Sequence, residues 1–245
     1  MYEQLKKIID ESDNIVFFGG AGVSTESGIP DFRSANGIYN QKTGISYSPE
    51  EVISHSFFVK NPEFFYKFYK EKMIFPDAKP DRAHIALAKL EQMGKLKAVI
   101  TQNIDGLHQK AGSKNVLELH GSVLKNYCMN CGAKYDLNYI ANSVGIPKCE
   151  KCGGTVRPDV VLYEEGLDMD VINQSVEYIS RADVLIVGGT SLVVYPAAGL
   201  INYYHGNKLV LINKTVTAGN NRANIFIMDS IGEVLGDIVD ALSGE

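Results

Sequence analysis

All four cysteines of this chain fall in two Cys-x-x-Cys pairs. Cys128 and Cys131 form the first pair, Cys149 and Cys152 form the second, and a glycine directly follows each pair. Four thiolates at this spacing suit tetrahedral Zn²⁺, and glycine permits the tight turn that a metal knuckle requires. A disulfide or a redox dithiol would not explain why both pairs have the same Cys-x-x-Cys-Gly pattern. Because four cysteines leave no open coordination position, we predict a structural zinc ion.

Around this segment, short apolar runs alternate with helical patterns. The apolar runs cover residues 15–18, 97–101, 116–119, 182–191, 209–213 and 225–228. Amphipathic helical spacing covers residues 2–11, 83–93, 170–180 and 231–242. Four or five of the runs end in Gly, Ser, Thr, Asn or Asp, which is typical of parallel strands with a site at their carboxyl ends. We predict an α/β, Rossmann-like doubly wound parallel sheet with a small inserted zinc-ribbon domain.

The same pattern predicts the domain boundaries. Residues 1–121 and 158–245 are expected to form the Rossmann-like domain, and 122–157 the zinc-binding insertion. A lid and an aromatic-rich helical segment, about 28–75, are expected to belong to the small domain. The aromatic residues of this segment are interpreted as helix packing.

A glycine-rich stretch, Gly19-Gly20-Ala21-Gly22, follows the first apolar run. Such a turn lets the backbone approach a ligand, and free N–H groups there favour a phosphate. The usual dinucleotide fingerprint is incomplete, because Thr25 takes the third glycine position. The continuation, 27–33, places Phe32 and Arg33 just after a Gly and a Pro that could act as hinges. We interpret it as a lid over a ligand, not as a strand-to-helix connection.

Polar side chains follow the strands predicted at 97–101 and 116–119. The cluster 102–108 supplies Gln, Asn, Asp and His at a strand end, where ligands of open α/β sheets collect. Asn103 and Asp105 could instead cap the next helix. His120 precedes a glycine at the other strand end, and histidine suits proton transfer near neutral pH. A packed, hydrogen-bonded histidine is the alternative.

Composition narrows the classes of partner. The chain has 245 residues and a net charge of −5, so it lacks the basic footprint of a direct nucleic-acid binder. The charge is compatible with a cationic peptide. The first residues lack the apolar core of an export signal, and no stretch reaches membrane-spanning length. We therefore expect reduced thiols and a cytoplasmic location. Nothing specifies an oligomer, and a monomer is expected.

Taken in order, these motifs resemble the sirtuin family of NAD-dependent protein lysine deacylases. The resemblance runs from about residue 13 to the carboxyl end. The motifs that carry it are Gly20–Ser24, Gly28–Arg33, Thr101–Asp105, Leu119–Gly121, the two cysteine pairs, Gly189–Ser191 and Val210–Asn213.

The resemblance implies a role for each matching residue. NAD phosphates and riboses would be bound by Ala21, Gly22, Thr25, Thr190, Ser191 and Asn213, with Met228 and Asp229 near the adenine. Phe32 and Arg33 would belong to the mobile lid. Gln102 and Asn103 would hold ribose and an ordered water, while Ile104 and Asp105 would form the nicotinamide pocket. His120 would be the general base. The acyl-lysine peptide would pair with Val160, Val161, Leu162 and Tyr163, opposite 192–194.

The activity implied is NAD-dependent deacetylation of lysine in proteins, with release of nicotinamide and 2′-O-acetyl-ADP-ribose. Relatives that prefer succinyl or malonyl groups carry a Tyr-x-x-Arg pair after the lid. We place the matching region at 37–43, which lacks that arginine, so an uncharged acyl group is expected. Glu164 stands where the family usually has glycine, which puts peptide preference in question.

Three other functions stay open from the sequence. A mono-ADP-ribosyltransferase would cleave NAD in the same way and use a protein acceptor. A Rossmann dehydrogenase would require the complete glycine fingerprint. A non-enzymatic NAD-binding or zinc-ribbon module would bind ligand without releasing nicotinamide.

Overall fold

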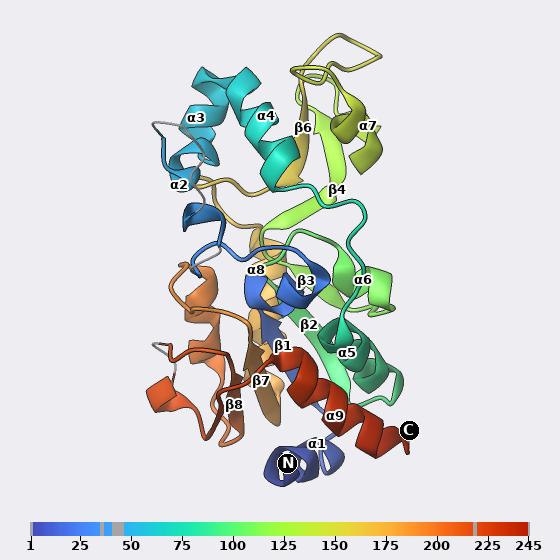
Figure 1. The fold of residues 1–245 in the computed structure, drawn as a ribbon, viewed down its shortest axis with the longest axis vertical. Helices are drawn as coiled ribbons and strands as arrows, with labels where there is room; N and C mark the ends of the chain where they lie inside the picture. The colour runs from blue at the N-terminus through green and yellow to red at the C-terminus, as the bar shows by residue number, and fades with distance from the viewer. Residues whose placement is uncertain (1, 35–36, 41–46, 218–219, 245) are drawn as a thin grey trace.

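The computed structural model describes residues 2–34, 37–40, 47–217 and 220–244. Part of the 37–43 region that bears on acyl preference lies outside these ranges. A six-stranded parallel sheet with the order β3-β2-β1-β7-β8-β9 forms the larger end of the molecule (Figure 1). Its strands are β1 (Ile15–Gly19), β2 (Leu96–Thr101), β3 (Val116–Glu118), β7 (Val184–Gly188), β8 (Leu209–Ile212) and β9 (Ile225–Ile227). The predicted doubly wound parallel sheet is thereby confirmed.

Helices cover both faces of this sheet, which explains its continuous apolar strands. Every residue of β1, β7 and β8 is buried. One face packs against α1 (Glu3–Asp10), α5 (Arg82–Gln92) and α9 (Ile231–Ser243). The other packs against α8 (Met169–Arg181) and the 3₁₀ helix η3 (Ala197–Tyr203). A strand buried on two faces has no polar side to alternate with, so its sequence is apolar throughout.

A second unit lies at the opposite end of the molecule (Figure 1). Its antiparallel sheet has the order β5-β4-β6, formed by β4 (Gly121–Cys128), β5 (Lys134–Tyr135) and β6 (Val156–Val160). The helices of this end are α2 (Pro49–Val52), α3 (His55–Lys60), α4 (Pro62–Lys72) and α7 (Leu137–Asn142). One core joins Phe65 and Tyr66 of α4 to Cys128 and Cys149. The aromatic segment therefore packs, and it packs directly on the cysteine-bearing sheet.

The glycine-rich turn leads into a short helix, contrary to the sequence interpretation. Residues 21–27 form the 3₁₀ helix η1 (Ala21–Ser27), so a short strand-to-helix connection precedes the segment interpreted as a lid. Irregular backbone begins only after Gly28, which has φ 84° and ends the helix. A Cβ on Gly22 would lie 2.8 Å from the Gly189 Cα. The glycine is thus required because the turn crosses the end of β7 closely.

Three short elements complete the chain. They are α6 (Leu107–Ala111) and the 3₁₀ helices η2 (Ile38–Asn40) and η4 (Asn220–Arg222). Among the described residues, no helix is both long and apolar enough to cross a bilayer.

The Gly121→Ala variant is expected to lose about 3 kcal/mol of unfolding free energy. Gly121 has φ 74°, and an added Cβ would lie 2.0 Å from the Asp159 carbonyl oxygen. Gly94→Ala is the matched control, because Gly94 has φ 76° but open space around its Cβ. Urea unfolding measures both. If both variants lost the same unfolding free energy, a clash between the Cβ added at position 121 and the Asp159 carbonyl would be contradicted.

Candidate functional site

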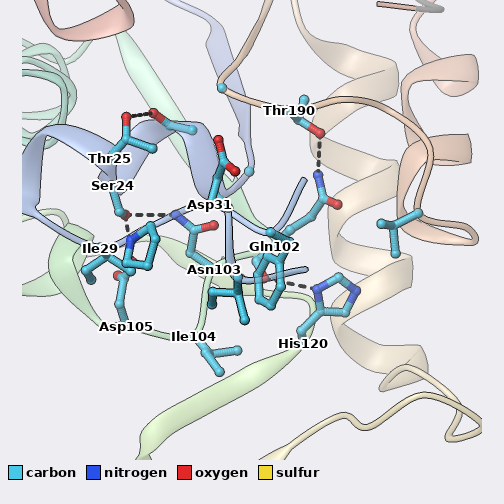
Figure 2. A pocket seen from close by; sticks show the side chains of 18 of the residues that line it. Ser24, Thr25, Ile29, Asp31, Gln102, Asn103, Ile104, Asp105, His120 and Thr190 are labelled. Carbon is cyan, nitrogen blue, oxygen red and sulfur yellow. Dashed lines mark hydrogen bonds between the residues drawn. The ribbon is translucent and has the colours of Figure 1, made fainter. Parts of the chain in front are cut away.

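A cavity of about 1570 Å³ lies at the carboxyl ends of the parallel strands and extends toward the second unit. Figure 2 shows its centre, with side chains from the segments after β1 and β2 and from His120, which directly precedes β4. The sequence-predicted residues that line it are Ala21, Gly22, Thr25, Phe32, Arg33, Gln102, Asn103, Ile104, Asp105, His120, Val160, Val161, Leu162, Tyr163, Thr190, Ser191, Asn213 and Asp229. Residues more than 200 positions apart in the chain thus meet at one site.

His120 is held in one tautomer by the main chain. Its Nδ1 lies 3.0 Å from the Gln102 carbonyl oxygen, which can only accept, so Nδ1 carries the proton (Figure 2). Nε2 of the neutral ring is therefore a free base. Burial lowers the pKa of His120 below its ordinary value, and the bond to Gln102 offsets this only in part. The ring is thus unprotonated at neutral pH and able to accept a proton.

Asn103 and Asp105 are positioned by Ser24, a residue that the sequence analysis did not select. The Asn103 amide donates to Ser24 Oγ at 3.0 Å, and Ser24 Oγ donates to Asp105 Oδ2 at 2.7 Å (Figure 2). His84 lies behind this pair, with Nε2 3.5 Å from Ser24 Oγ and Nδ1 2.8 Å from Asp81. Asp105 also accepts from the N–H of Leu107, the first residue of α6, so it both bonds to the start of that helix and lines the cavity.

A second hydrogen bond joins the ends of β2 and β7. The Gln102 side-chain amide donates to Thr190 Oγ1 at 3.0 Å, and Leu192 N–H donates to the same oxygen (Figure 2). Asn213 follows β8, and its amide donates to the Thr215 carbonyl. These bonds fix polar side chains at the carboxyl ends of the parallel strands. A ligand with several hydroxyl and phosphate oxygens would contact them there.

The glycine turn offers fewer free N–H groups than its sequence suggested. Gly20 and Gly22 donate to the carbonyls of Gly188 and Gly189, and Val23 donates to Gly20. Within the described chain, the N–H of Ala21 has no such acceptor. Thr25 Oγ1 is turned onto the Gly22 carbonyl at 3.0 Å. The glycines therefore serve close packing between β1 and β7, which leaves the Ala21 N–H as the donor of the turn without a backbone acceptor among the described residues.

The lid residues contact the far wall of the cavity. The rings of Phe32 and Tyr39 lie 5.4 Å apart, and the Arg33 guanidinium lies 5.1 Å from the Tyr39 ring centre. Tyr39 and Tyr163 share a hydrogen bond of 3.0 Å between their hydroxyl groups, and Arg33 donates to Tyr163 at 3.4 Å. The lid is thereby tied to the 160–163 segment in this conformation.

The 160–163 segment lines the cavity, but much of its backbone is already hydrogen-bonded. Only Val160 belongs to a strand, β6. Tyr163 donates to the Ile53 carbonyl and accepts from the His55 N–H, while Val161 donates to the His120 carbonyl. Pairing of a peptide along all four residues would require these bonds to break. Beyond this segment, Gly166 and Leu167 have backbone N–H and carbonyl groups with no backbone hydrogen-bond partner within the described chain.

The prediction for Met228 is not supported by its position. Its side chain is 64% exposed beside the edge strand β9 and does not line the cavity. Asp229 does line the cavity, but its carboxylate accepts from the Tyr2 hydroxyl at 2.7 Å and from the Ser230 N–H. That carboxylate therefore anchors the amino-terminal segment. A short edge strand gives too little pattern for sequence reasoning to orient such residues.

The four cysteines form a compact thiol cluster that fits zinc. All four Sγ atoms lie within 4.8 Å of one another, with separations of 3.5 Å for Cys128–Cys152 and 3.6 Å for Cys131–Cys149. Tetrahedral Zn–S bonds of about 2.3 Å place sulfurs about 3.8 Å apart. The glycine after each pair has positive φ and donates to the carbonyl of the first cysteine, as the predicted knuckle requires. No fifth ligand position is left, so the ion would be structural.

Comparison with known proteins gives a consistent result. The model of the Sir2 family matches residues 20–196. A protein of Clostridium perfringens named NAD-dependent protein deacetylase is 66% identical over 238 residues, 97% of this chain and 98% of its own. One of the same name from Clostridium acetobutylicum is 65% identical over 96% and 97% of the two chains.

Solved structures agree with these relatives. A Sir2 protein in complex with a deacetylated p53 peptide and 3′-O-acetyl ADP-ribose has a TM-score of 0.89 and 41% identity, covering 99% of this chain and 98% of its own. A Sir2 homologue in complex with NAD has a TM-score of 0.87 and 40% identity, covering 100% of this chain and 94% of its own.

Proposed function

This chain belongs to the Sir2 family, and we propose that it removes acetyl groups from lysine side chains of proteins with NAD as co-substrate. One observation carries the proposal beyond family membership. His120, Asn103 and Phe32 line the same cavity, between the ends of a parallel sheet and the segment expected to hold peptide. The products would be nicotinamide, 2′-O-acetyl-ADP-ribose and unmodified lysine. The net charge of −5 gives no support to a nucleic-acid partner.

The polar residues at the carboxyl ends of the parallel strands would bind and orient NAD. In this proposal Ala21, Thr190 and Asn213 contact phosphate and ribose oxygens, and Gln102 lies close enough to Thr190 to order the same ribose. Ile104 and Asp105 would receive the nicotinamide ring, with Asp105 accepting from the carboxamide. Both Asp105 oxygens already accept one protein donor each, which fixes the carboxylate before a ligand arrives.

His120 would perform the proton transfer. When nicotinamide leaves, the ribose becomes electrophilic and the acyl oxygen can attack it. His120 Nε2 would then accept a ribose hydroxyl proton, and Asn103 would hold an ordered water nearby. Phe32 would cover the reactive carbon and exclude bulk water. No cysteine outside the zinc cluster is required as a nucleophile, in agreement with the cysteine content.

The chain would divide into two working units. We propose a Rossmann-like domain of residues 1–121 and 158–245 and a zinc-binding insertion of residues 122–157. The antiparallel sheet runs slightly further than this, from Gly121 to Val160. Val160 ends β6 and lines the cavity. The antiparallel sheet that carries the zinc cysteines would therefore support the 160–163 segment that is proposed to bind the peptide.

Incubation with an acetyl-lysine peptide tests the proposal. We expect loss of the acetyl group only when NAD is present, with nicotinamide released in step. Transfer of ADP-ribose to the protein or peptide, with acetyl-lysine intact, would indicate an ADP-ribosyltransferase instead. NAD binding without nicotinamide release would indicate a non-enzymatic module.

The acid limb of kcat/KM is expected to lie below pH 6.5, the ordinary histidine value. Burial lowers the pKa of His120, so the ring stays an unprotonated base until the pH falls through that lowered value. A pH profile of kcat/KM with the acetyl peptide measures the limb. A midpoint above 6.5 would contradict the assignment of a buried, neutral His120 as base.

A further inference from the structure

Glu164 occupies a backbone conformation that side chains disfavour. Its φ is 76°, and among the described non-glycine residues only Tyr2 and Leu192 share a positive φ. Left-handed backbone costs an L-residue about 1–2 kcal/mol. Glu164 and Leu192 lie on two segments, 160–165 and 189–196, that contribute walls to the cavity. A glycine would relieve the strain at 164, so the carboxylate needs its own explanation.

The Glu164 side chain is held in place and kept ionised. Its Oε2 accepts from the Ser56 N–H at 2.8 Å and from Ser56 Oγ at 2.6 Å. These two bonds, the hydroxyl bond first, hold the pKa of Glu164 below its usual value. In the described chain, Oε1 makes no hydrogen bond. One carboxylate oxygen is therefore anchored, and the other stays open at the exposed rim of the cavity.

The negative charge of the neighbouring carboxylate, Glu165, is in contrast compensated by other side chains. Glu165 pairs with Arg157 at 2.9 Å and with His55 at 2.8 Å, and it accepts from the Leu162 N–H. Within the described ranges, no ion pair reaches Glu164. Lys60, on α3, lies close enough to influence the charge of Glu164 without pairing to it there. His55 also lies close enough to act on that charge, but neither side chain pairs with it, so the rim carries one fixed carboxylate with an oxygen open to a ligand.

We propose that Glu164 selects substrates that carry lysine or arginine close to the acetyl-lysine. This rests on the proposed deacetylase function, because the partner is the flanking sequence of the same peptide. An acetyl-lysine that reaches the cavity along the 160–165 segment brings its neighbours past the rim. A cationic side chain there would complete the charge that Glu164 Oε1 leaves unpaired. An exposed ion pair changes affinity by about two- to fivefold.

Peptides that differ at a single flanking position test the proposal. Acetyl-lysine peptides with Arg, Ala or Glu at each of the two positions before and after the acetyl-lysine are compared by kcat/KM. We expect the wild type to prefer Arg over Glu by about two- to fivefold at one or more positions, and the preference to weaken as salt is added. Glu164→Gln keeps an oxygen for Ser56 and should abolish the preference for Arg over Glu.

Asp170→Asn is the matched control, because Asp170 is exposed and nearby in sequence but does not line the cavity. It should keep the wild-type preference. Equal Arg-to-Glu ratios in the wild type and Glu164→Gln would overturn the role of Glu164 while the Ala peptides still report deacetylation. Failure of every peptide to be deacetylated would instead overturn the proposed function.

Discussion

Replacing His120 with alanine is expected to lower kcat/KM for deacetylation by about 10²–10⁴-fold, the usual contribution of a positioned base. The reason is geometric. The Gln102 carbonyl fixes the proton on Nδ1 and directs the free Nε2 as base, and no other imidazole lines the cavity among the described residues. The protein should still fold, because His120 is only partly buried and its side chain bonds only to that carbonyl.

The control for this variant is His205→Ala. His205 is exposed and lies outside the cavity-lining set, so its loss should leave turnover unchanged. Steady-state kinetics on the acetyl peptide, together with thermal melting of each variant, separates lost chemistry from lost structure. Near-native turnover in a folded His120→Ala protein would remove His120 from the proton-transfer role.

Removal of zinc is expected to have the largest effect on stability. Structural zinc contributes an apparent ~10–16 kcal/mol to the folding of zinc-finger peptides. Here Cys128 and Cys149 are buried in one core with Phe65, Tyr66 and Val160. We therefore expect metal loss to unfold the sheet from Gly121 to Val160, to loosen the α4 packing, and to abolish activity indirectly.

Cys131→Ala, with elemental analysis and hydrogen exchange, measures this effect without relying on activity. Amides of β4 and β6 should lose protection, whereas β1 and β7, in separate cores, should keep theirs. Chelation of the wild type should produce the same pattern, and added Zn²⁺ should reverse it. A zinc-free protein with unchanged melting temperature and protection would contradict a structural zinc site.

The elements predicted best from the sequence are those with a strong local cause. β1, β7 and β8 are apolar at nearly every position because both of their faces are buried, and such runs are recognisable without tertiary information. The cysteine knuckles are similar, since ligand spacing and the following glycine lie within a few residues. His120 could be placed at a strand end because it directly follows the run 116–119 and precedes a glycine.

What the sequence could not supply depends on contacts between distant residues. Ser24 meets His84 and Asn103 only after folding, so nothing in its own neighbourhood marks it. The sequence of the turn after β1 suggested free N–H groups for a phosphate. In the structure, Gly20 and Gly22 donate theirs to backbone carbonyls at the end of β7. The short helix at 21–27 was not predicted, because the glycines at 19, 20 and 22 gave no helical signal. Met228, predicted near the adenine, does not line the cavity, and a short edge strand does not show from its sequence which way its residues face.

The central claim is that one cavity transfers the acetyl group of lysine to the ribose of NAD. The most direct test is a reaction with a peptide whose acetyl group carries ¹³C, followed by mass spectrometry of the products. The account predicts that the label appears on ADP-ribose, in equal amount with nicotinamide and unmodified lysine peptide. Label recovered as free acetate, or retained on the peptide while nicotinamide is released, would contradict it.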